Sequence, residues 1–205
     1  MDESILEHKL DGEDFNIDGK YEKIDEIPFD FMRKRMSVVV RNKRMEDVLI
    51  CKGAVEEVLS LCNNYETKDG TETFKGEMIE ETNSIVKILN EDGFRVIAIA
   101  YKVRNADKKE YSVEDEKNLT LLGFMAFLDP PKDTSKEAIA KFHKYNVDVK
   151  VLTGDNEIIT RKICKQVNLK ADSLLLGSDL DKLSDEELQV KAENTTIFAK
   201  LSPMH

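Results

Sequence analysis

The hydrophobic pattern of residues 21–128 predicts a sheet with helices beside it. Short apolar or alternating runs, which are typical of strands, recur along this part of the chain. They cover residues 21–31, 35–40, 47–51, 94–101 and 120–128. Apolar residues three and four positions apart predict helices at 54–62 and 77–90. A turn at 41–44 joins two strands into a hairpin, so we expect an α+β domain with an antiparallel sheet flanked by helices.

From residue 129 onward, strands and helices alternate. The expected elements are a helix at 134–145, a strand at 147–152, a helix at 157–167, an apolar run at 174–176, a helix at 184–193 and a strand at 195–199. This alternation predicts a parallel α/β unit. The prolines that follow Asp129 end the preceding strand, and the character of the chain changes between 121 and 129. We therefore expect two domains, 1–121 and 122–205.

Composition limits the classes of function. The 205 residues are 40% hydrophobic and 35% charged, which favours a soluble protein with a modest core. No apolar run approaches the roughly 18 to 20 residues that a membrane helix requires. The first residues do not resemble a signal peptide, which would carry basic residues and then an apolar segment. The chain is expected to be cytoplasmic, with no direct membrane contact.

The net charge of −10 argues against nonspecific binding to nucleic acid or anionic lipid. Any anionic ligand must then be held by a local cluster of lysine and arginine. The three cysteines lack a CxxC spacing and the three histidines are dispersed, so neither a disulfide framework nor a metal site is expected. The cysteines are Cys51, Cys62 and Cys164.

Candidate chemistry in the second part lies where its strands end. The run 147–152 leads into Thr153-Gly154-Asp155, directly before a predicted helix. Such a loop presents backbone N–H groups, a hydroxyl and a carboxylate to a phosphate or its metal ion. Parallel sheets place ligands at the carboxyl ends of their strands, where Asp129 also lies. A structural turn with an Asp or Asn cap, and a rigid hinge after Asp129, are equally open interpretations.

In the first part, aromatic and basic residues occur together. Phe29 and Phe31 flank Asp30, just before the basic run 33–35. An adenine ring can stack on phenylalanine while a cation contacts its phosphates. Stacking of this kind contributes about 1–3 kcal/mol. The alternative is two core phenylalanines beside a solvated charged turn.

Two further candidates follow in the first part. Lys52 and Gly53 precede a predicted helix, where a cation and a close backbone approach suit an anionic ligand. A lysine that merely ends a strand is the alternative. Arg95 would reach the same pocket only if its strand lay beside the others, which residue spacing does not decide.

These motifs occur in an order that resembles P-type cation-transporting ATPases. The segments are Phe29 with Met36-Ser37-Val38, Lys52-Gly53-Ala54, Arg95, Asp129-Pro130-Pro131-Lys132, Thr153-Gly154-Asp155-Asn156 and Phe198-Ala199-Lys200-Leu201-Ser202-Pro203. The stretches 24–40 and 127–132 are similar to the magnesium-transporting subfamily in particular. The resemblance covers essentially all of the chain.

The resemblance implies a nucleotide-binding domain followed by part of a phosphorylation domain of the haloacid-dehalogenase type, which is α/β. The parent protein would be an integral membrane pump, with this portion on the cytoplasmic side of the cell membrane. It would couple ATP hydrolysis, through an aspartyl-phosphate, to transport of a cation, Mg²⁺ by subfamily. The implied ligands are ATP and ADP, with Mg²⁺ arriving as Mg-ATP. The implied partners are the actuator and transmembrane domains of the same pump.

The resemblance also assigns roles to residues. Phe29 would stack on adenine, Glu3 would contact the adenine amino group, and Arg95 would reach the phosphates. Lys52 and Gly53 would line the pocket, and Lys34 matches a basic residue near the nucleotide. Thr153, Gly154 and Asp155 would contact the transferred phosphoryl group, with Asp129 near it. Phe31 stands where calcium pumps have an arginine, so that phosphate contact is not expected here.

Two family motifs are absent from this sequence. Neither the Asp-Lys-Thr-Gly-Thr segment with its phospho-accepting Asp nor the metal-binding Gly-Asp-Gly-x-Asn-Asp segment occurs. Phosphoryl transfer depends on positioning and electrostatics at those groups, so the chain alone is not expected to turn over. One rival is a free-standing haloacid-dehalogenase-type phosphatase, but its Asp-x-Asp candidate, residues 179–181, lies in an acidic loop. The other rival is a non-catalytic binding module.

Overall fold

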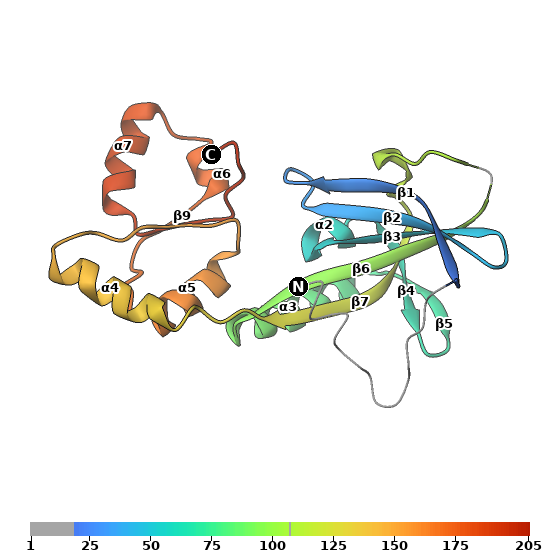
Figure 1. Cartoon of the computed structure of the whole chain (residues 1–205), viewed down its shortest axis with the longest axis horizontal. Coiled ribbons are helices and arrows are strands. Elements are labelled where there is room, and N and C mark those ends of the chain that lie inside the picture. Colours follow the sequence, from blue (N-terminus) through green and yellow to red (C-terminus); the bar gives the residue numbers. More distant parts are fainter. Residues whose placement is uncertain (1–18, 107) are drawn as a thin grey trace. The chain divides into compact units, whose positions relative to one another are not determined.

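The computed structural model describes residues 19–106 and 108–205, which form two compact units (Figure 1). Of the described residues, those up to Glu80 and those of Val96–Phe127 form one unit, and those of Glu81–Arg95 and Leu128–His205 form the other. The division passes through helix α3 (Gly76–Glu91) and the start of strand β6. Within the described part of the chain, no helix combines the length and the apolar character needed to cross a membrane.

The described residues of the first unit build a seven-stranded sheet in the order β1-β2-β3-β6-β7-β4-β5. Its strands are β1 (Tyr21–Asp30), β2 (Arg35–Asn42), β3 (Glu46–Ala54), β4 (Cys62–Thr67), β5 (Gly70–Thr73), β6 (Phe94–Asn105) and β7 (Leu119–Leu128). The β1–β2, β2–β3, β3–β6 and β4–β5 pairs are antiparallel, whereas β4 runs parallel to β7. The sheet is therefore mixed: the predicted antiparallel pairing is present in four pairs of strands, and the β4–β7 pair departs from it. The chain between β4 and β7 is long enough for the crossover that a parallel pair requires.

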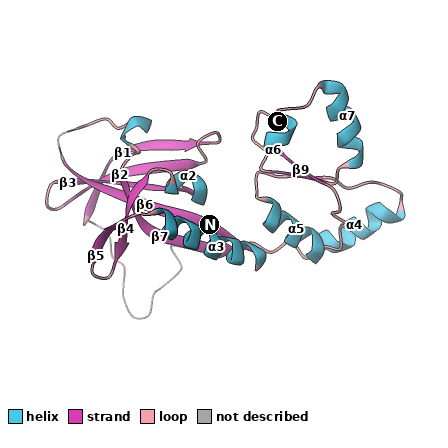
Figure 2. Ribbon diagram, turned by 180° about the vertical axis from the view of Figure 1, so that it is seen from behind, coloured by secondary structure: helices cyan, strands magenta, loops and turns pink. Residues whose placement is uncertain are grey.

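Helix α2 (Val55–Leu59) is shorter than predicted. Cys62, which the periodicity assigned to this helix, begins β4 instead. The buried side chains of Val55, Val58 and Leu59 anchor α2 against one face of the sheet (Figure 2). Helix α3 agrees with its prediction, and the polar segment after Cys62 forms the β4–β5 hairpin.

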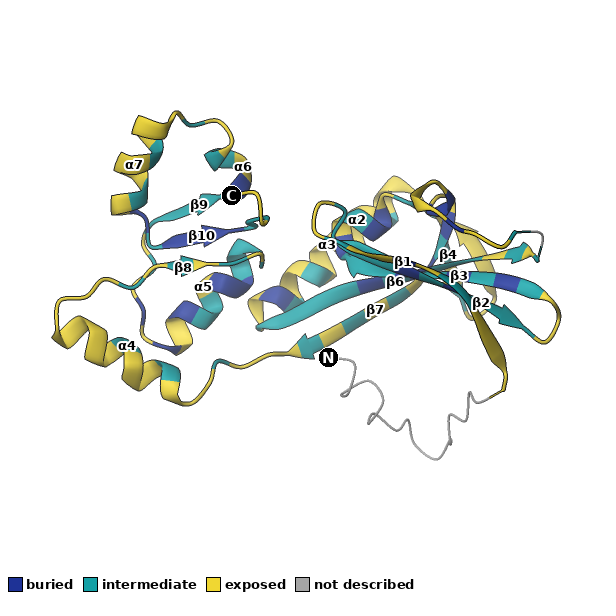
Figure 3. Ribbon diagram, turned by 45° about the horizontal axis from the view of Figure 1, so that its top comes forward, coloured by how far each residue is buried: buried dark blue, intermediate teal, exposed yellow. Residues whose placement is uncertain are grey.

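Strand alternation directs one face of the central strands into the core. The register places Val39 opposite Leu49 and Cys51 opposite Ala100, and all four side chains are buried. Residues of a strand alternate between its two faces, so the intervening positions form the other face, which is half-buried. The buried stretches of β3 and β6 are visible in Figure 3.

The polar segment between β6 and β7 is held to the sheet by two carboxylates, of which Asp47 is buried and Asp25 is half-buried. The hydroxyl of Tyr111 donates to Asp47 at 2.7 Å, and its backbone N–H donates to Asp25 at 2.6 Å. Arg41 donates two hydrogen bonds to Asp47, at 2.7 and 3.0 Å. The bond from Arg41 lowers the pKa of Asp47 below its ordinary value, and the bond from the Tyr111 backbone does the same for Asp25. The sequence of this segment has little hydrophobic periodicity, so hydrogen bonds to the strands, and not local patterning, hold it in place.

Strands and helices alternate in the second unit, and its sheet is parallel as predicted. Its described residues form three parallel strands in the order β8-β10-β9. Its elements are α4 (Thr134–Lys144), β8 (Val151–Leu152), α5 (Glu157–Gln166), β9 (Leu174–Leu176), α6 (Gly177–Leu180), α7 (Asp185–Asn194) and β10 (Ile197–Ala199). The strand predicted at 147–152 is reduced to Val151 and Leu152, the two residues that pair with β10.

The core of the second unit lies between α5 and β10. Cys164, Val167, Leu169, Ile197 and Ala199 are buried together there. Helix α7 begins with a capping box: the backbone N–H of residue 187 donates to the hydroxyl of residue 184, and the N–H of residue 184 donates to the carboxylate of residue 187.

The lowered pKa of Asp47 predicts acid-sensitive stability. Ionised Asp47 stabilises the fold above the unfolded-state pKa of about 3.9, and this contribution is lost as the pH falls through the lower folded-state pKa. Asp47→Asn should reduce the free energy of unfolding at neutral pH by about 1–3 kcal/mol. It should also flatten the pH dependence in acid. Urea unfolding followed by circular dichroism at several pH values checks this, and parallel wild-type and variant curves would contradict it.

Candidate functional site

Two exposed aromatic rings mark one candidate region of the first unit. The rings of Phe29 and Phe31 lie 5.2 Å apart at 89°, an edge-to-face pair. Phe29 is 49% exposed and Phe31 is 63% exposed. The alternative of two core phenylalanines is therefore wrong. Aromatic faces that remain exposed to solvent are suited to stacking a planar ligand.

The turn that follows Phe29 has a constrained backbone. The carboxylate of Asp30 accepts hydrogen bonds from the N–H groups of Met32 at 2.7 Å and Arg33 at 2.8 Å. The bond from Arg33 lowers the pKa of Asp30. Lys34 closes the turn with an N–H bond to the Asp30 carbonyl at 2.7 Å, and it adopts a φ of 49°. This left-handed conformation is uncommon for lysine, so the turn depends on its surroundings.

Lys52 and Gly53 lie directly beside this turn. Gly53 is opposite Arg35 in the β2–β3 register, and the N–H of Ala54 donates to the Lys34 carbonyl at 2.9 Å. A Cβ atom on Gly53 would lie 2.5 Å from that same carbonyl oxygen. Glycine is thus required here by the approach of β2. Lys52 lies inside β3, which continues to residue 54, so it does not simply end the strand.

Met36 belongs to this region, although the candidate residues chosen from the sequence did not include it. It pairs with Lys52, and directly opposed residues project to the same face of a sheet. The next pair, Ser37 and Cys51, is buried, so Met36 and Lys52 occupy the opposite, half-buried face. The period of two along a strand places Met36 on the same face as Val38 and Val40, and this was the signal that could have identified it. Glu3, the expected contact of the adenine amino group, lies outside the described residues.

In the second unit, Arg95 connects two of the predicted carboxylates. Its guanidinium lies 3.0 Å from Asp129 and 2.7 Å from Asp155. The carboxylate of Asp155 also accepts a hydrogen bond from the Thr153 hydroxyl at 3.1 Å. The structure therefore brings together residues that are distant in the sequence. Arg95 is the second residue of β6 and is a cation between two acidic groups.

The loop of Thr153, Gly154 and Asp155 is fixed through its backbone to the segment after β10. The N–H of residue 201 donates to the Thr153 carbonyl at 3.0 Å, and the N–H of residue 200 donates to the Asp155 carbonyl at 2.8 Å. A Cβ on Gly154 would lie 3.3 Å from the carbonyl oxygen of residue 201. This packing leaves little room for a larger residue at position 154.

The helix start after this loop already has an intramolecular cap. The side chain of Asn156 accepts hydrogen bonds from the N–H groups of Ile158 and Ile159, each at 3.0 Å. These donors at the start of α5 are therefore satisfied without a ligand. The Asn cap considered from the sequence is confirmed.

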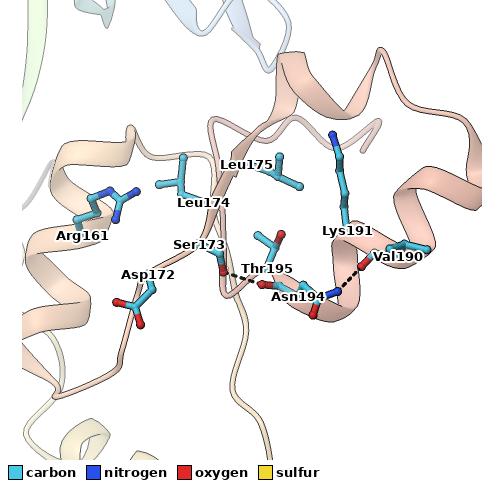
Figure 4. A pocket seen from close by; sticks show the side chains of 9 residues that line it. All are labelled: Arg161, Asp172, Ser173, Leu174, Leu175, Val190, Lys191, Asn194 and Thr195. Atoms are coloured by element: carbon cyan, nitrogen blue, oxygen red, sulfur yellow. Dashed lines mark hydrogen bonds between the residues drawn. The ribbon is translucent and has the colours of Figure 1, made fainter.

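Two pockets open in the second unit. The larger, of about 490 Å³, is lined by residues of α5, β9 and α7, including Arg161, Ser173 and Lys191 (Figure 4). Its lining contains none of the residues singled out from the sequence. The smaller, of about 230 Å³, is mainly apolar and includes Thr153 and Asp155. The predicted residues thus adjoin the smaller pocket.

Comparison with known proteins agrees with the family resemblance that these motifs indicated. A sequence profile described as "P-type ATPase, cytoplasmic domain N" matches residues 8–134. The chain is 40% identical over its whole length to "Magnesium-transporting ATPase, P-type 1" of Escherichia coli (strain K12), of which it covers 23%. It is 30% identical over 92% of its length to "Calcium-transporting ATPase" of Bacillus subtilis (strain 168), of which it covers 22%.

The same 40% identity and 23% coverage hold for "Magnesium-transporting ATPase, P-type 1" of Salmonella typhimurium (strain LT2). The chain thus spans less than a quarter of the length of these curated relatives. The profile match includes the turn after Phe29 and the strand that carries Lys52. Because that match covers more than half of the chain, the chain belongs to the P-type ATPase family and contains its cytoplasmic domain N.

Proposed function

We propose that this chain is the ATP-binding cytoplasmic portion of a P-type ion pump. Residues 1–121 form the nucleotide-binding domain, and residues 122–205 form part of a phosphorylation domain of the haloacid-dehalogenase type. The observation that carries the proposal is the exposed ring of Phe29 beside a turn that adjoins Lys52. An aromatic face and a cation at one site suit a nucleoside triphosphate.

In this proposal, Phe29 stacks on the adenine ring, while Lys34 and Lys52 attract the phosphates. Gly53 keeps the turn close to β3. Glu3 contacts the adenine amino group. The exposed ring and the nearby cations fit ATP or ADP, which need a planar stacking surface and positive charge.

In this proposal, residues of the second unit contact the phosphate groups of ATP. Thr153, Gly154 and Asp155, with Asp129 near them, meet the transferred phosphoryl group, and Arg95 contacts the phosphates. Mg²⁺, brought in as Mg-ATP, would supply charge neutralisation there. The parallel sheet with its loop at the end of β8 supports this assignment.

The parent protein hydrolyses ATP through an aspartyl-phosphate that forms outside this chain. That cycle drives cation transport, with Mg²⁺ as the proposed cargo because the named magnesium pumps share 40% identity with the chain. The partners are the actuator and transmembrane domains of the same pump. This portion lies on the cytoplasmic side of the membrane.

Isothermal titration of the chain with ATP tests the proposal. Phe29→Ala should weaken binding by the loss of stacking, about 1–3 kcal/mol or roughly fivefold to more than a hundredfold. Lys52→Ala should weaken ATP more than adenosine, because it removes a phosphate contact. A matched control is Phe142→Ala, since Phe142 is 48% exposed on α4. Saturable binding that survives both site substitutions, or no binding by the wild-type chain, would count against the proposal.

Gly53→Ala tests the close approach of the turn. The added methyl group would overlap the Lys34 carbonyl, so the turn must move away from β3. We expect a loss of about 1–3 kcal/mol in the free energy of unfolding and weaker ATP binding. Gly76→Ala is the control, because nothing lies within 4 Å of the Cβ it would add. Thermal unfolding and ATP titration of both variants provide the measurement, and unchanged values for Gly53→Ala would refute the steric argument.

A further inference from the structure

A buried glutamate lies behind the turn that carries the aromatic pair. Glu116 follows a short 3-10 helix (Val113–Asp115) and is only 2% exposed. Its carboxylate accepts hydrogen bonds from Arg33 at 2.7 Å, Arg35 at 2.8 Å and the hydroxyl of Ser37 at 2.8 Å. Burial of a carboxylate is unfavourable unless it is paired and hydrogen-bonded, and this one is both.

Of the two arginines bonded to Glu116, Arg33 lies in the turn and Arg35 is the first residue of β2. Arg33 also donates to the carbonyl of Pro28 at 3.0 Å, which lies just before Phe29. Arg35 is opposite Gly53 in the register. One buried carboxylate therefore fixes the end of β1, the turn and the start of β2 to each other.

The turn needs such an anchor. Lys34 has a φ of 49°, a conformation that lysine seldom adopts without support from its surroundings. Phe29 lies just before the turn, and Met36, just after it, pairs with Lys52. A shift of the turn would therefore change the distance between the ring of Phe29 and the cation of Lys52. Affinity for a ligand that contacts both groups depends on that spacing being set before binding.

We infer that Glu116 is a positioning residue of the nucleotide site, which holds Phe29 and Lys34 in place through Arg33 and Arg35. This inference rests on the proposed function. Glu116 does not itself touch the nucleotide: its carboxylate is buried and occupied by the arginines and Ser37. Removing its charge should loosen the turn and weaken binding without removing any ligand contact.

Asp47 provides a matched control. It is also a buried carboxylate, 1% exposed, on the same sheet, and it accepts hydrogen bonds from Arg41 and Tyr111. Its arginine lies toward the opposite end of β2 from the aromatic turn. Loss of either carboxylate should destabilise the fold, but only loss of Glu116 should disturb the turn.

The experiment compares Glu116→Gln with Asp47→Asn in the complete chain. ATP affinity is measured by calorimetry, and exchange of the Met32, Arg33 and Ala54 amide protons is followed by NMR without nucleotide. We expect Glu116→Gln to weaken ATP binding about tenfold and Asp47→Asn less than about twofold. Exchange at the three amides should rise in Glu116→Gln relative to Asp47→Asn. A purely structural role would produce equal effects in both variants.

The outcomes separate the two proposals. A wild-type chain that does not bind ATP would overturn the proposed function and the inference with it. Wild-type binding with equal affinities for Glu116→Gln and Asp47→Asn would overturn only the role of Glu116. If Glu116→Gln does not fold, Arg33→Ala replaces it, because the Arg33 side chain is 21% exposed and Glu116 keeps Arg35 and Ser37. That variant should also weaken ATP binding, and wild-type affinity would overturn the inference.

Discussion

The arrangement of the first unit depends on the need to pair every carboxylate that its sheet buries. Water solvates an exposed carboxylate, but a buried one must find cations or hydrogen-bond donors within the protein. Glu116 is satisfied by Arg33 and Arg35, and Asp47 by Arg41 and Tyr111. These contacts hold the irregular segment between β6 and β7 against the first strands. They also determine the course of the turn after β1.

The candidate nucleotide site follows from that constraint together with strand register. The register places Arg35 opposite Gly53, where only a glycine allows the two backbones to approach. The turn after Phe29 and Phe31 therefore lies beside the end of β3, the strand that contains Lys52. A turn held in this way would lower the entropic cost of binding a ligand, because fewer groups need ordering.

Hydrophobic periodicity in the sequence was sufficient for most of the elements. Helices α3, α4 and α5, the β2–β3 hairpin and the parallel character of the second sheet agree with their patterns. The failures have a common cause in non-local pairing. Cys62 pairs with Leu119 of β7 instead of continuing the predicted helix, and the strand predicted at 147–152 keeps only the two residues that pair with β10.

The sequence by itself determined the order of the motifs and the residue types of the site, because these are local properties of the chain. It identified Phe29, Lys52 and Thr153 as candidates, but it left their burial and neighbours open. Tertiary structure decided that Phe29 is exposed, that Gly53 serves the approach of β2, and that Glu116 anchors the turn. Each of these depends on segments far apart in the chain, and only folding establishes which of them meet.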